Sequence, residues 1–429
     1  MSLNIDNYYQ LHITKCVRYE RERERDEQDE LVQHKQKNSN LHKAKKEKND
    51  EFYTQYEDIE KEVNAYIDFN KDVFRDKVIL CPCDDPDKSK FTKYFAQNFK
   101  RLGIKKLIST SYAKNSKSFP HDLLQSCLEK DSPLYDIMKT DIKGKIFTLE
   151  GDKNKDGSIN MFDLEFKGYL EGDGDFRSEE VKKLRDEADI IITNPPFSLF
   201  REFVDWIMEA NKKFLIIGNM NAITYKETFK YIKENKLWLG NNAVKQFIFA
   251  GTKEQCNKNI TEIDGVLYAD FGNVIWFTNL EHKKRYQQMH FMTMEENLRH
   301  NKKDLPNGYE KYDNYDAIEV PKVSLIPSDY DGVMGVPITY LGNHNPKEFE
   351  ILGATQRECH ELVPDTKKYD DYKEILNSTN EKTGASGGKT NENANLIGRG
   401  HGKTFFRNSE GREIYSCYQR LFIKKRNKK

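Results

Sequence analysis

The sequence contains little cysteine and no complete set of metal-binding side chains. Its seven cysteines are scattered, and the one close pair is Cys81 and Cys83. No second Cys-x-x-Cys or His-x-x-x-His pair completes a zinc set around them, so we expect no metal cofactor. An odd, scattered cysteine count also offers no disulfide framework, which is typical of the reducing cytoplasm.

Long hydrophobic runs are missing too. No stretch approaches the ~18 to 20 apolar residues that a membrane-spanning helix needs. The first residues, MSLNIDNYYQLHITK, lack the apolar centre of a secretory signal. These absences predict a cytoplasmic protein without a membrane partner.

Neither sign of charge is in excess. Lys plus Arg and Asp plus Glu both number 70, so the formal net charge is zero. Any binding of nucleic acid must therefore rest on a local basic face. The basic runs HKAKKEK (42–48) and KKRNKK (424–429) suit phosphate contacts, and they equally suit solvated segments.

Two stretches have the strand–helix–strand order of βαβ units. The first runs from the apolar strand VILC (78–81) through an amphipathic helix to KKLIST (105–110). The second runs from ADIIIT (188–193) through another amphipathic helix to KKFLIIGN (212–219). Strands joined in this way predict an α/β fold with a mostly parallel sheet and helices on both faces.

Composition divides the chain into three parts. Residues 1–40 form a charged N-terminal extension, and residues 41–290 hold both βαβ units. After about residue 290, short strand-like pieces with more Gly, Asn and Pro predict a mixed α+β region over 291–429. Within it, the low-complexity stretch near 377–402 predicts a loop, either disordered or ordered by a partner.

One acidic segment looks like the start of a calcium-binding loop. Asp152, Asn154 and Asp156 are followed by Gly157, but the twelfth position is Asp163 rather than Glu. The flanking residues alternate like strands rather than helices. We interpret the segment as a β-hairpin turned by Lys-Asp-Gly, without calcium.

The most informative stretch is ADIIITNPPFSLFREF (188–203), in which Asn-Pro-Pro-Phe directly follows an apolar strand. Two prolines can simply end a strand, since they donate no backbone hydrogen bonds. However, ligands of open α/β sheets bind outside the carboxyl ends of the strands, which is where this turn lies.

The turn suits methyl transfer to an exocyclic amine. The side-chain oxygen of Asn194 and the carbonyl of Pro195 can accept the two N–H groups, which aims the nitrogen lone pair at a methyl donor. The prolines hold that carbonyl in a fixed direction, and Phe197 can stack on a flat base. A base in duplex DNA must first flip out to reach such a site.

The chain resembles the EcoRI-type adenine-specific DNA methyltransferases, a family that uses S-adenosylmethionine (SAM). Beyond NPPF, the resemblance rests on strings spread over residues 41–355: LHKAKKEKNDEFYTQYEDIEKE, CDDPDKSKFTKYF, GDGDF, FLIIGNMNAITYKE, VIWFTNLEHKKR, NYDAIEV and DYDGVMGVPITYL. It implies a Rossmann-like SAM-dependent methyltransferase domain at 41–290 and a target-recognition region at 291–429. It also implies SAM as cofactor, double-stranded DNA as partner and, within a restriction–modification system, a cognate restriction endonuclease acting on the same site.

The resemblance assigns roles to particular residues. The expected catalytic residues are those of NPPF: Asn194, Pro195, Pro196 and Phe197. The expected cofactor-binding residues of the segments DEFYT and CDDP are Asp50, Phe52, Tyr53, Thr54, Cys83, Asp84, Asp85 and Pro86. The sequence departs from the usual FxGxG cofactor loop, because PCDDPDKS contains no glycine.

A third segment, GDGDF, adds Asp173, Asp175 and Phe176 to the expected cofactor-binding residues. The strand KKLIST (105–110) ends without the acidic residue that usually binds the ribose of SAM. This gap makes the GDGD carboxylates the expected acceptors for the adenosine part. An ordinary acidic turn is the alternative, since Gly and Asp are common turn residues.

Several alternatives stay open. Cytosine N4 presents the same two N–H groups as adenine N6, and similar NPP-aromatic sites act on RNA bases or on a protein glutamine. A DNA-binding protein without catalysis is the rival from another class, and the intact NPPF argues against it. Pro82-Cys83 resembles the nucleophile of cytosine-C5 methyltransferases, but direct transfer to an amine needs no thiolate.

Polar residues of the C-terminal part are candidates for base or phosphate contacts by residue type. Ordinary loop residues are the alternative for each of them. They are Asn343, His344, Asn345, Arg399 and His401.

Overall fold

The computed structural model of the chain describes residues 52–86, 89–113, 127–249, 253, 259–355, 369–391 and 393–426. The expected extension at 1–40, the basic run at 42–48 and Asp50 lie outside these residues.

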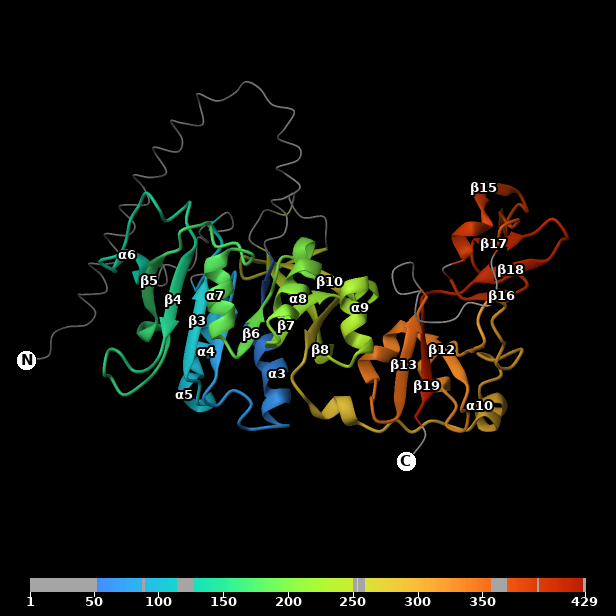
Figure 1. Ribbon diagram of the computed structural model, residues 1–429, viewed down its shortest axis with the longest axis horizontal. Helices are drawn as coiled ribbons and strands as arrows, with labels where there is room; N and C mark the ends of the chain where they lie inside the picture. Colours follow the sequence, from blue (N-terminus) through green and yellow to red (C-terminus); the bar gives the residue numbers. More distant parts are fainter. Residues whose placement is uncertain are drawn as a thin grey trace, which may run out of the picture.

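A ten-stranded sheet forms the first part of the molecule (Figure 1). Nine of its strands lie side by side in the order β1 (Phe52–Thr54), β8 (Trp238–Phe249), β10 (Val266–Thr278), β7 (Lys213–Asn219), β6 (Ile190–Thr193), β2 (Val78–Cys81), β3 (Lys106–Thr110), β4 (Lys145–Leu149) and β5 (Glu165–Tyr169). The tenth, β9 (Ile260–Ile263), pairs with β10.

The sheet is mixed, so the prediction of a mostly parallel sheet is wrong. The central strands β7, β6, β2 and β3 are parallel neighbours, as the two βαβ units require. The pairs on either side of them, β10–β7, β10–β8, β1–β8, β3–β4 and β4–β5, are antiparallel. The hairpins β4–β5 and β9–β10 reverse the chain without a crossover helix, and this is what antiparallel pairing permits.

Helices cover both faces of the sheet, as predicted. One face packs on α3 (Tyr56–Ile67), α4 (Lys90–Gln97) and α5 (Phe99–Leu102), and the other on α7 (Glu179–Glu187), α8 (Phe200–Glu209) and α9 (Lys226–Lys233). Side chains of a strand alternate between faces. Ile190 and Ile192 of β6 therefore join the first core, whereas Ile191 joins the second. The short helix α6 (Cys127–Lys130) precedes β4.

The acidic segment at 152–163 lies in the loop between β4 and β5, so its interpretation as a hairpin rather than a helix–loop–helix unit is confirmed. Asp163 turns back into this loop. Its carboxylate accepts hydrogen bonds from the main-chain N–H groups of Lys153 (2.9 Å), Asn154 (3.2 Å) and Asn160 (3.0 Å). The described residues contain no group of three His, Cys, Asp or Glu side chains placed to hold a metal ion.

Two smaller sheets follow α10 (Met294–His300). The first has four strands in the order β11 (Ile318–Glu319), β12 (Val333–Pro337), β19 (Arg420–Lys425) and β13 (Phe349–Ala354). The second has five, in the order β15 (Lys382–Ser386), β14 (Lys373–Leu376), β17 (Thr404–Arg407), β18 (Glu413–Ser416) and β16 (Asn395–Ile397).

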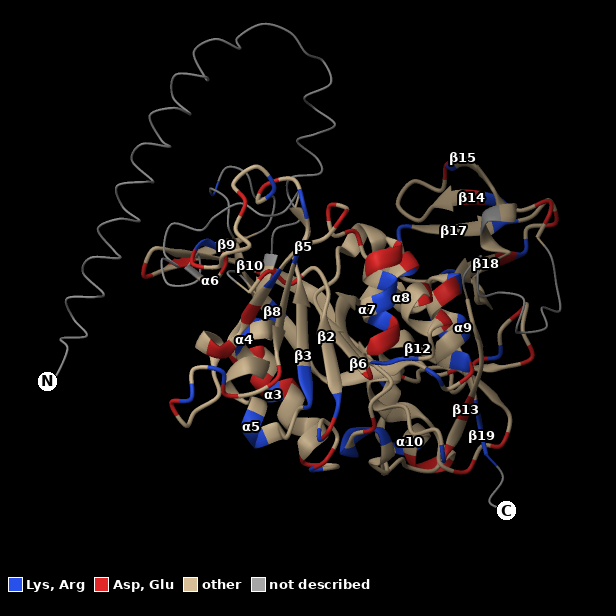
Figure 2. Cartoon of the chain, turned by 60° about the vertical axis from the view of Figure 1, so that its left-hand side comes forward, with Lys and Arg blue, Asp and Glu red and all other residues tan. Residues whose placement is uncertain are grey.

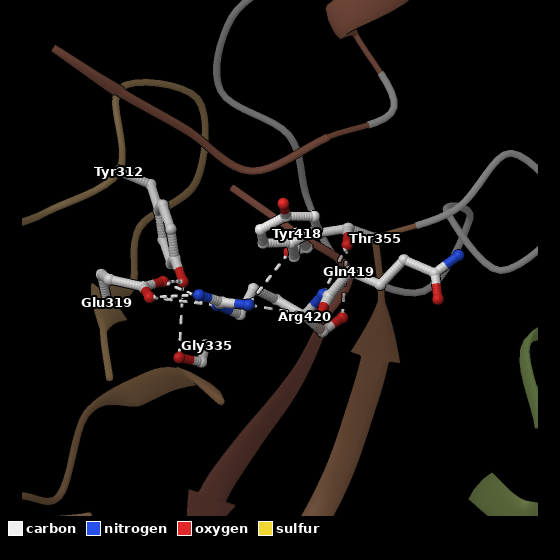
Figure 3. A network of polar contacts seen from close by, with 7 residues as sticks. All are labelled: Tyr312, Glu319, Gly335, Thr355, Tyr418, Gln419 and Arg420. Carbon is white, nitrogen blue, oxygen red and sulfur yellow. Dashed lines mark hydrogen bonds and ion pairs between the residues drawn. The ribbon is translucent and has the colours of Figure 1, made fainter. Parts of the chain in front are cut away.

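A buried ion pair links β11 and β19 of the four-stranded sheet, at the end of β19 that follows β18 (Figure 3). Arg420 opens β19, and its guanidinium grips the carboxylate of Glu319 on β11, with nitrogen–oxygen distances of 2.6 to 3.1 Å. The hydroxyl of Tyr312 donates to the same carboxylate. Arg420 Nη1 also donates to the carbonyl of Tyr418 at 3.1 Å, which fixes the turn between β18 and β19.

The Gly- and Asn-rich segment at 377–402 is not a loop throughout, since β15 and β16 both lie within it. Asparagine side chains hold it in place. Asn395 donates to the carbonyl of Thr390 at 2.9 Å, and Asn314 donates to that of Asn393 at 2.7 Å. Composition alone suggests a loop because the segment has few apolar residues: Ala394 and Leu396 are buried, and side-chain hydrogen bonds add to their packing.

The hydrophobic core continues across the boundary that we expect near residue 290. Phe229 of α9 and Phe277 of β10 belong to the same buried cluster as Met334 of β12 and Phe349 of β13. The four-stranded sheet is thus packed onto the α8–α9 side of the large sheet. The division into parts at 41–290 and 291–429 stays a prediction.

Charged side chains of both signs lie on the exposed helices and loops. Figure 2 shows acidic and basic residues interleaved along α7, so this face is not uniformly basic. None of the helices in the described ranges has the length and apolar character of a membrane span.

Candidate active site at the carboxyl ends of the parallel strands

The NPPF turn begins where β6 ends, at Thr193, and leads through a short 3-10 helix (Phe197–Leu199) into α8. Pro195 is buried, and the side-chain oxygen of Asn194 is shielded from solvent. Pro196 caps the 3-10 helix with φ −56° and ψ 122°. The local sequence therefore builds a stiff turn beside the carboxyl ends of β2, β3 and β7, the parallel strands of the sheet centre.

Phe197 lies against two aromatic rings of the antiparallel part of the sheet. Its ring centroid is 6.4 Å from that of Phe247 on β8 and 6.4 Å from that of Phe271 on β10, both in edge-to-face geometry. Phe247 and Phe271 themselves are 5.1 Å apart. We name these three side chains the aromatic cluster. Such contacts hold Phe197 in place and are worth ~0.5 to 1.5 kcal/mol each.

The expected N-terminal cofactor segment is an edge strand beside this cluster. β1 pairs with β8 so that Phe52 lies opposite Phe249, Tyr53 opposite Ile248 and Thr54 opposite Phe247. Thr54 is buried. The structure therefore places Phe52, Tyr53 and Thr54 next to the strand that carries part of the aromatic cluster.

The turn after β2 contains no glycine, but one of its residues takes a backbone conformation that is typical of glycine. Cys83 adopts φ +63°, a left-handed conformation that normally favours glycine. The N–H of Asp84 then donates to the carbonyl of Thr110 at the end of β3, over 2.8 Å. Farther along, the carbonyl of Asp85 accepts the N–H of Ser89, the N-cap of α4, at 2.7 Å. Pro86 completes the described part of this turn.

Asp84 places a buried carboxyl group in the site. Burial raises the pKa of its carboxyl to about 7, although the hydroxyls of Thr193 and Ser89 lower it in part. Ser89 Oγ donates to Oδ1 at 2.8 Å. Within the described residues, Oδ2 has no hydrogen-bond partner, and neither does the buried hydroxyl of Thr110. Two such atoms beside one strand end suit a polar ligand.

Cys83 is not poised as a nucleophile. Burial raises the pKa of its thiol, and the nearby carboxylates of Asp84 and Asp175 raise it further. Both effects favour the neutral thiol over the thiolate that a nucleophile needs, which argues against the Pro82-Cys83 interpretation.

The GDGD loop lies against the end of β3. The N–H of Ala113 donates to the carbonyl of Asp173 at 2.8 Å. Gly174 has φ +88°, and a Cβ built there would lie 2.1 Å from the carbonyl oxygen of Ser111. Only glycine permits this close approach. The acidic loop is thereby brought to the strand end that lacks an acidic residue of its own.

The members of this loop differ in their surroundings. Arg177 binds both carboxylate oxygens of Asp175, at 2.9 and 2.7 Å, and reaches Glu202 on α8 at 2.8 Å. Asp173 Oδ1 accepts the N–H of Asp175 at 3.2 Å. Phe176 is only 2% exposed and packs on Phe203 and Trp206, so its burial is explained by the protein core.

Several residues of the C-terminal part that are candidates for DNA contacts are buried or already bonded to other residues of the protein. Asn345 is buried and accepts the N–H of Lys347 at 3.0 Å. Burial lowers the pKa of His344 to about 3, which leaves its ring neutral. Arg399 forms a double hydrogen bond with Glu413, at 2.7 Å each, whereas Asn343 and His401 are exposed.

Sequence reasoning missed Phe247, Phe271 and Thr110. One signal for Phe271 was present: Gly272 interrupts a strand-like run, which indicates a bulge. Indeed β10 bulges there, since Asp270 pairs with Gln246 but Val274 pairs with Val244. The two ring partners of Phe197 lie 50 and 74 residues away in sequence, so no local pattern reveals them.

Comparison with known proteins gives a consistent family. The sequence model of the family described as "Adenine-specific methyltransferase EcoRI" matches residues 40–426. The Type II methyltransferase M.EcoRI of Escherichia coli is 44% identical over 333 residues, which cover 73% of this chain and 89% of that protein. The Type II methyltransferase M.MgeORF184P of Mycoplasma genitalium is 35% identical, and the alignment covers 73% of this chain and 85% of that protein. M.MpnI of Mycoplasma pneumoniae, also a Type II methyltransferase, is 34% identical over 73% of this chain and 84% of its own length. No solved structure matches the chain.

Proposed function

The chain belongs to the adenine-specific methyltransferase EcoRI family, and on that premise we propose that it methylates N6 of adenine at a specific site in duplex DNA, with SAM as methyl donor. The observation that carries this proposal is the NPPF turn at the carboxyl end of β6, stiffened by its prolines and set against the aromatic cluster.

In the reaction, Asn194 and Pro195 act on the amine. The oxygens of the Asn194 side chain and the Pro195 carbonyl accept the two N–H groups, so the nitrogen lone pair turns out of the plane of the base. Because the turn is rigid, this arrangement needs little reorganisation during the reaction. Phe197 stacks on the flipped base and is backed by Phe247 and Phe271.

The residues at the ends of β2 and β3 fit SAM, which supplies an activated methyl group on a sulfonium when bound. Asp84 Oδ2 and the hydroxyl of Thr110 are buried polar atoms suited to groups of this polar ligand. Asp173 takes the place of the acidic residue that the end of β3 lacks. Asp175 is the weaker candidate because its carboxylate already binds Arg177.

Residues 291–429 would provide target recognition, and the enzyme would serve as the modification partner of a restriction endonuclease that cuts the same site. The relatives that are named Type II methyltransferases support this setting. A cytoplasmic location fits an enzyme that acts on the DNA of its own cell.

The deciding experiment is single-molecule sequencing of plasmid DNA from cells that express the chain, with Asn194→Ala as the control. Modified adenine at one short motif, absent from the control, is the expected result. Modified cytosine at that motif would establish N4 methylation instead. No modified base in either sample would overturn the proposal, and SAM-dependent labelling of RNA or of a protein glutamine would then identify the substrate.

A further inference from the structure

A pair of asparagine side chains lies at the end of β7, opposite the bulge of β10 that also carries Phe271. Asn219 Oδ1 accepts the main-chain N–H of Asn221 at 2.9 Å and the side-chain N–H of Asn273 at 3.0 Å. Asn273 comes from the bulge of β10 and precedes Val274, which pairs with Asn219 at the end of β7. We name Asn219 and Asn273 the amide pair.

One backbone group fixes the orientation of both amides. A main-chain N–H can only donate, so the atom of Asn219 that faces Asn221 must be the oxygen. The atom of Asn273 that faces this oxygen must then be its nitrogen. Asn219 Nδ2 is therefore a donor in a fixed direction. This assignment of nitrogen and oxygen follows from the hydrogen-bond partners of the two amides.

The amide pair is on the side of the sheet where the target base is expected. Leu215 and Ile217 of β7 point into the same core on which Phe197 packs. Side chains of a strand alternate, so Asn219 shares their face. β7 is also the parallel neighbour of β6, which ends in Asn194. Asn219 and Asn273 are both half-buried, so they stay accessible to a ligand.

The bulge connects the pair to the cluster. Residues 271 to 273 of β10 lie between the register pairs Asp270–Gln246 and Val274–Val244, so Phe271 and Asn273 come from the same irregular stretch. Bulges next to active sites redirect side chains. Here the bulge presents one aromatic ring to Phe197 and one carboxamide to Asn219.

On the basis of the function proposed above, we propose that Asn219 donates a hydrogen bond from Nδ2 to a ring nitrogen of the flipped adenine, and that Asn273 is the positioning residue that holds it. The amine already uses its two N–H groups on Asn194 and Pro195, so what remains on the adenine edge is an acceptor. N1 and N7 flank the amine and are the two acceptors in question.

The test combines protein variants with altered bases. The DNA is a duplex that carries the methylated motif found by sequencing, with adenine, 1-deazaadenine or 7-deazaadenine at the target position. Each analogue removes one ring acceptor and keeps the amine. We expect the wild-type enzyme to lose about tenfold in kcat/KM on one analogue, the size of one neutral hydrogen bond.

The informative variant is Asn219→Asp, because its carboxylate still accepts the N–H of Asn221 but has lost the donor. It should be slower on adenine and should show no further loss on the sensitive analogue. Asn273→Ala should lose part of this sensitivity. The matched control is Asn221→Ala, which keeps its main-chain donor and has an exposed side chain, so it should behave as the wild type does.

Equal rates of the wild type on all three bases would overturn the inference, as would an Asn219→Asp enzyme that keeps the wild-type sensitivity. Failure of the proposed function has a different signature, namely no N6-methyladenine from the wild type on the unmodified duplex. Asn219→Ala provides a second variant if the aspartate perturbs folding.

Discussion

The main-chain N–H of Ala113 donates to the carbonyl of Asp173 over 2.8 Å, and this bond ties the acidic loop to the end of β3. We therefore expect Asp173→Asn to weaken SAM binding by roughly 10- to 100-fold, since a hydrogen bond to a charged acceptor contributes ~1.5 to 3 kcal/mol. Asp175→Asn is the matched comparison and should weaken binding less, because Arg177 already holds its carboxylate. Isothermal titration with SAM measures both. If Asp175→Asn weakened SAM binding more than Asp173→Asn, the ribose contact would be assigned to Asp175.

Asn194→Ala should abolish most turnover while leaving binding largely intact. Its oxygen acts on the amine mainly at the transition state, so kcat should fall by ~100-fold or more. Single-turnover methylation and equilibrium binding of SAM and DNA separate the two effects. Ser198→Ala, an exposed change in the same turn, is the control. A near-normal rate for Asn194→Ala would remove Asn194 from the mechanism.

Phe197→Ala should impair capture of the flipped base. Stacking of a base on an aromatic side chain is worth ~1 to 3 kcal/mol, so the flipped population should fall by about tenfold. A fluorescent 2-aminopurine at the target position reports flipping. Phe162→Ala, an equally simple truncation on the exposed loop between β4 and β5, should leave the signal unchanged. Undiminished flipping in Phe197→Ala would contradict the stacking role.

Asp84 should make folding stability depend on pH. Its folded-state pKa of about 7 lies above the ordinary value of 3.8, so the folded state holds a proton that the unfolded state releases. The contribution of protonated Asp84 to the stability of the folded state is fully present below pH ~4 and is lost as pH rises through about 7. At 1.36 kcal/mol per pH unit this amounts to roughly 4 kcal/mol at most.

The check is urea unfolding of the wild type and of Asp84→Asn between pH 4 and 8. As pH rises, the unfolding free energy of the wild type should fall relative to that of Asp84→Asn. Other titrating groups are common to both proteins and cancel in the difference. A constant difference across this range would mean that Asp84 ionises as an ordinary carboxyl.

The Arg420–Glu319 pair should matter for stability more than an exposed pair does. Arg420→Met leaves the carboxylate of Glu319, 7% exposed, without its cation, and such a loss costs about 3 to 5 kcal/mol. Arg399→Met breaks a pair whose arginine side chain is 48% exposed, and should cost at most ~1 kcal/mol. Chemical denaturation of both variants makes the comparison. Similar losses of stability in both variants would show that the four-stranded sheet tolerates removal of the buried pair.

The sequence was sufficient for the local parts of the site. The apolar strand before NPPF, the prolines within it and the amphipathic helix after it are all encoded within residues 188–211, and the structure has them as expected. The two βαβ units were likewise readable, because strand and helix periodicities differ and each unit is continuous in the chain.

Other features depended on contacts between distant segments. The mixed direction of the sheet, the pairing of Thr54 with Phe247 and the bulge that brings Phe271 to Phe197 all involve strands far apart in sequence. The order within 377–402 comes from strand pairing with distant segments and from asparagine side chains bonded to distant main chain, as Asn314 is to Asn393. Composition records that such residues are polar, and it does not record where their partners lie.

The sequence by itself determined the turn to which we assign the chemistry: a rigid Asn-Pro-Pro-Phe turn after a buried strand, set by propensities that act over a few residues. Only the tertiary structure decided the setting of that chemistry. It placed the GDGD loop at the end of β3, buried Asp84 so that its pKa rises, and oriented the amide pair. Burial and hydrogen-bond direction depend on which surfaces meet when the chain folds, and this is a property of the packed molecule rather than of any short segment.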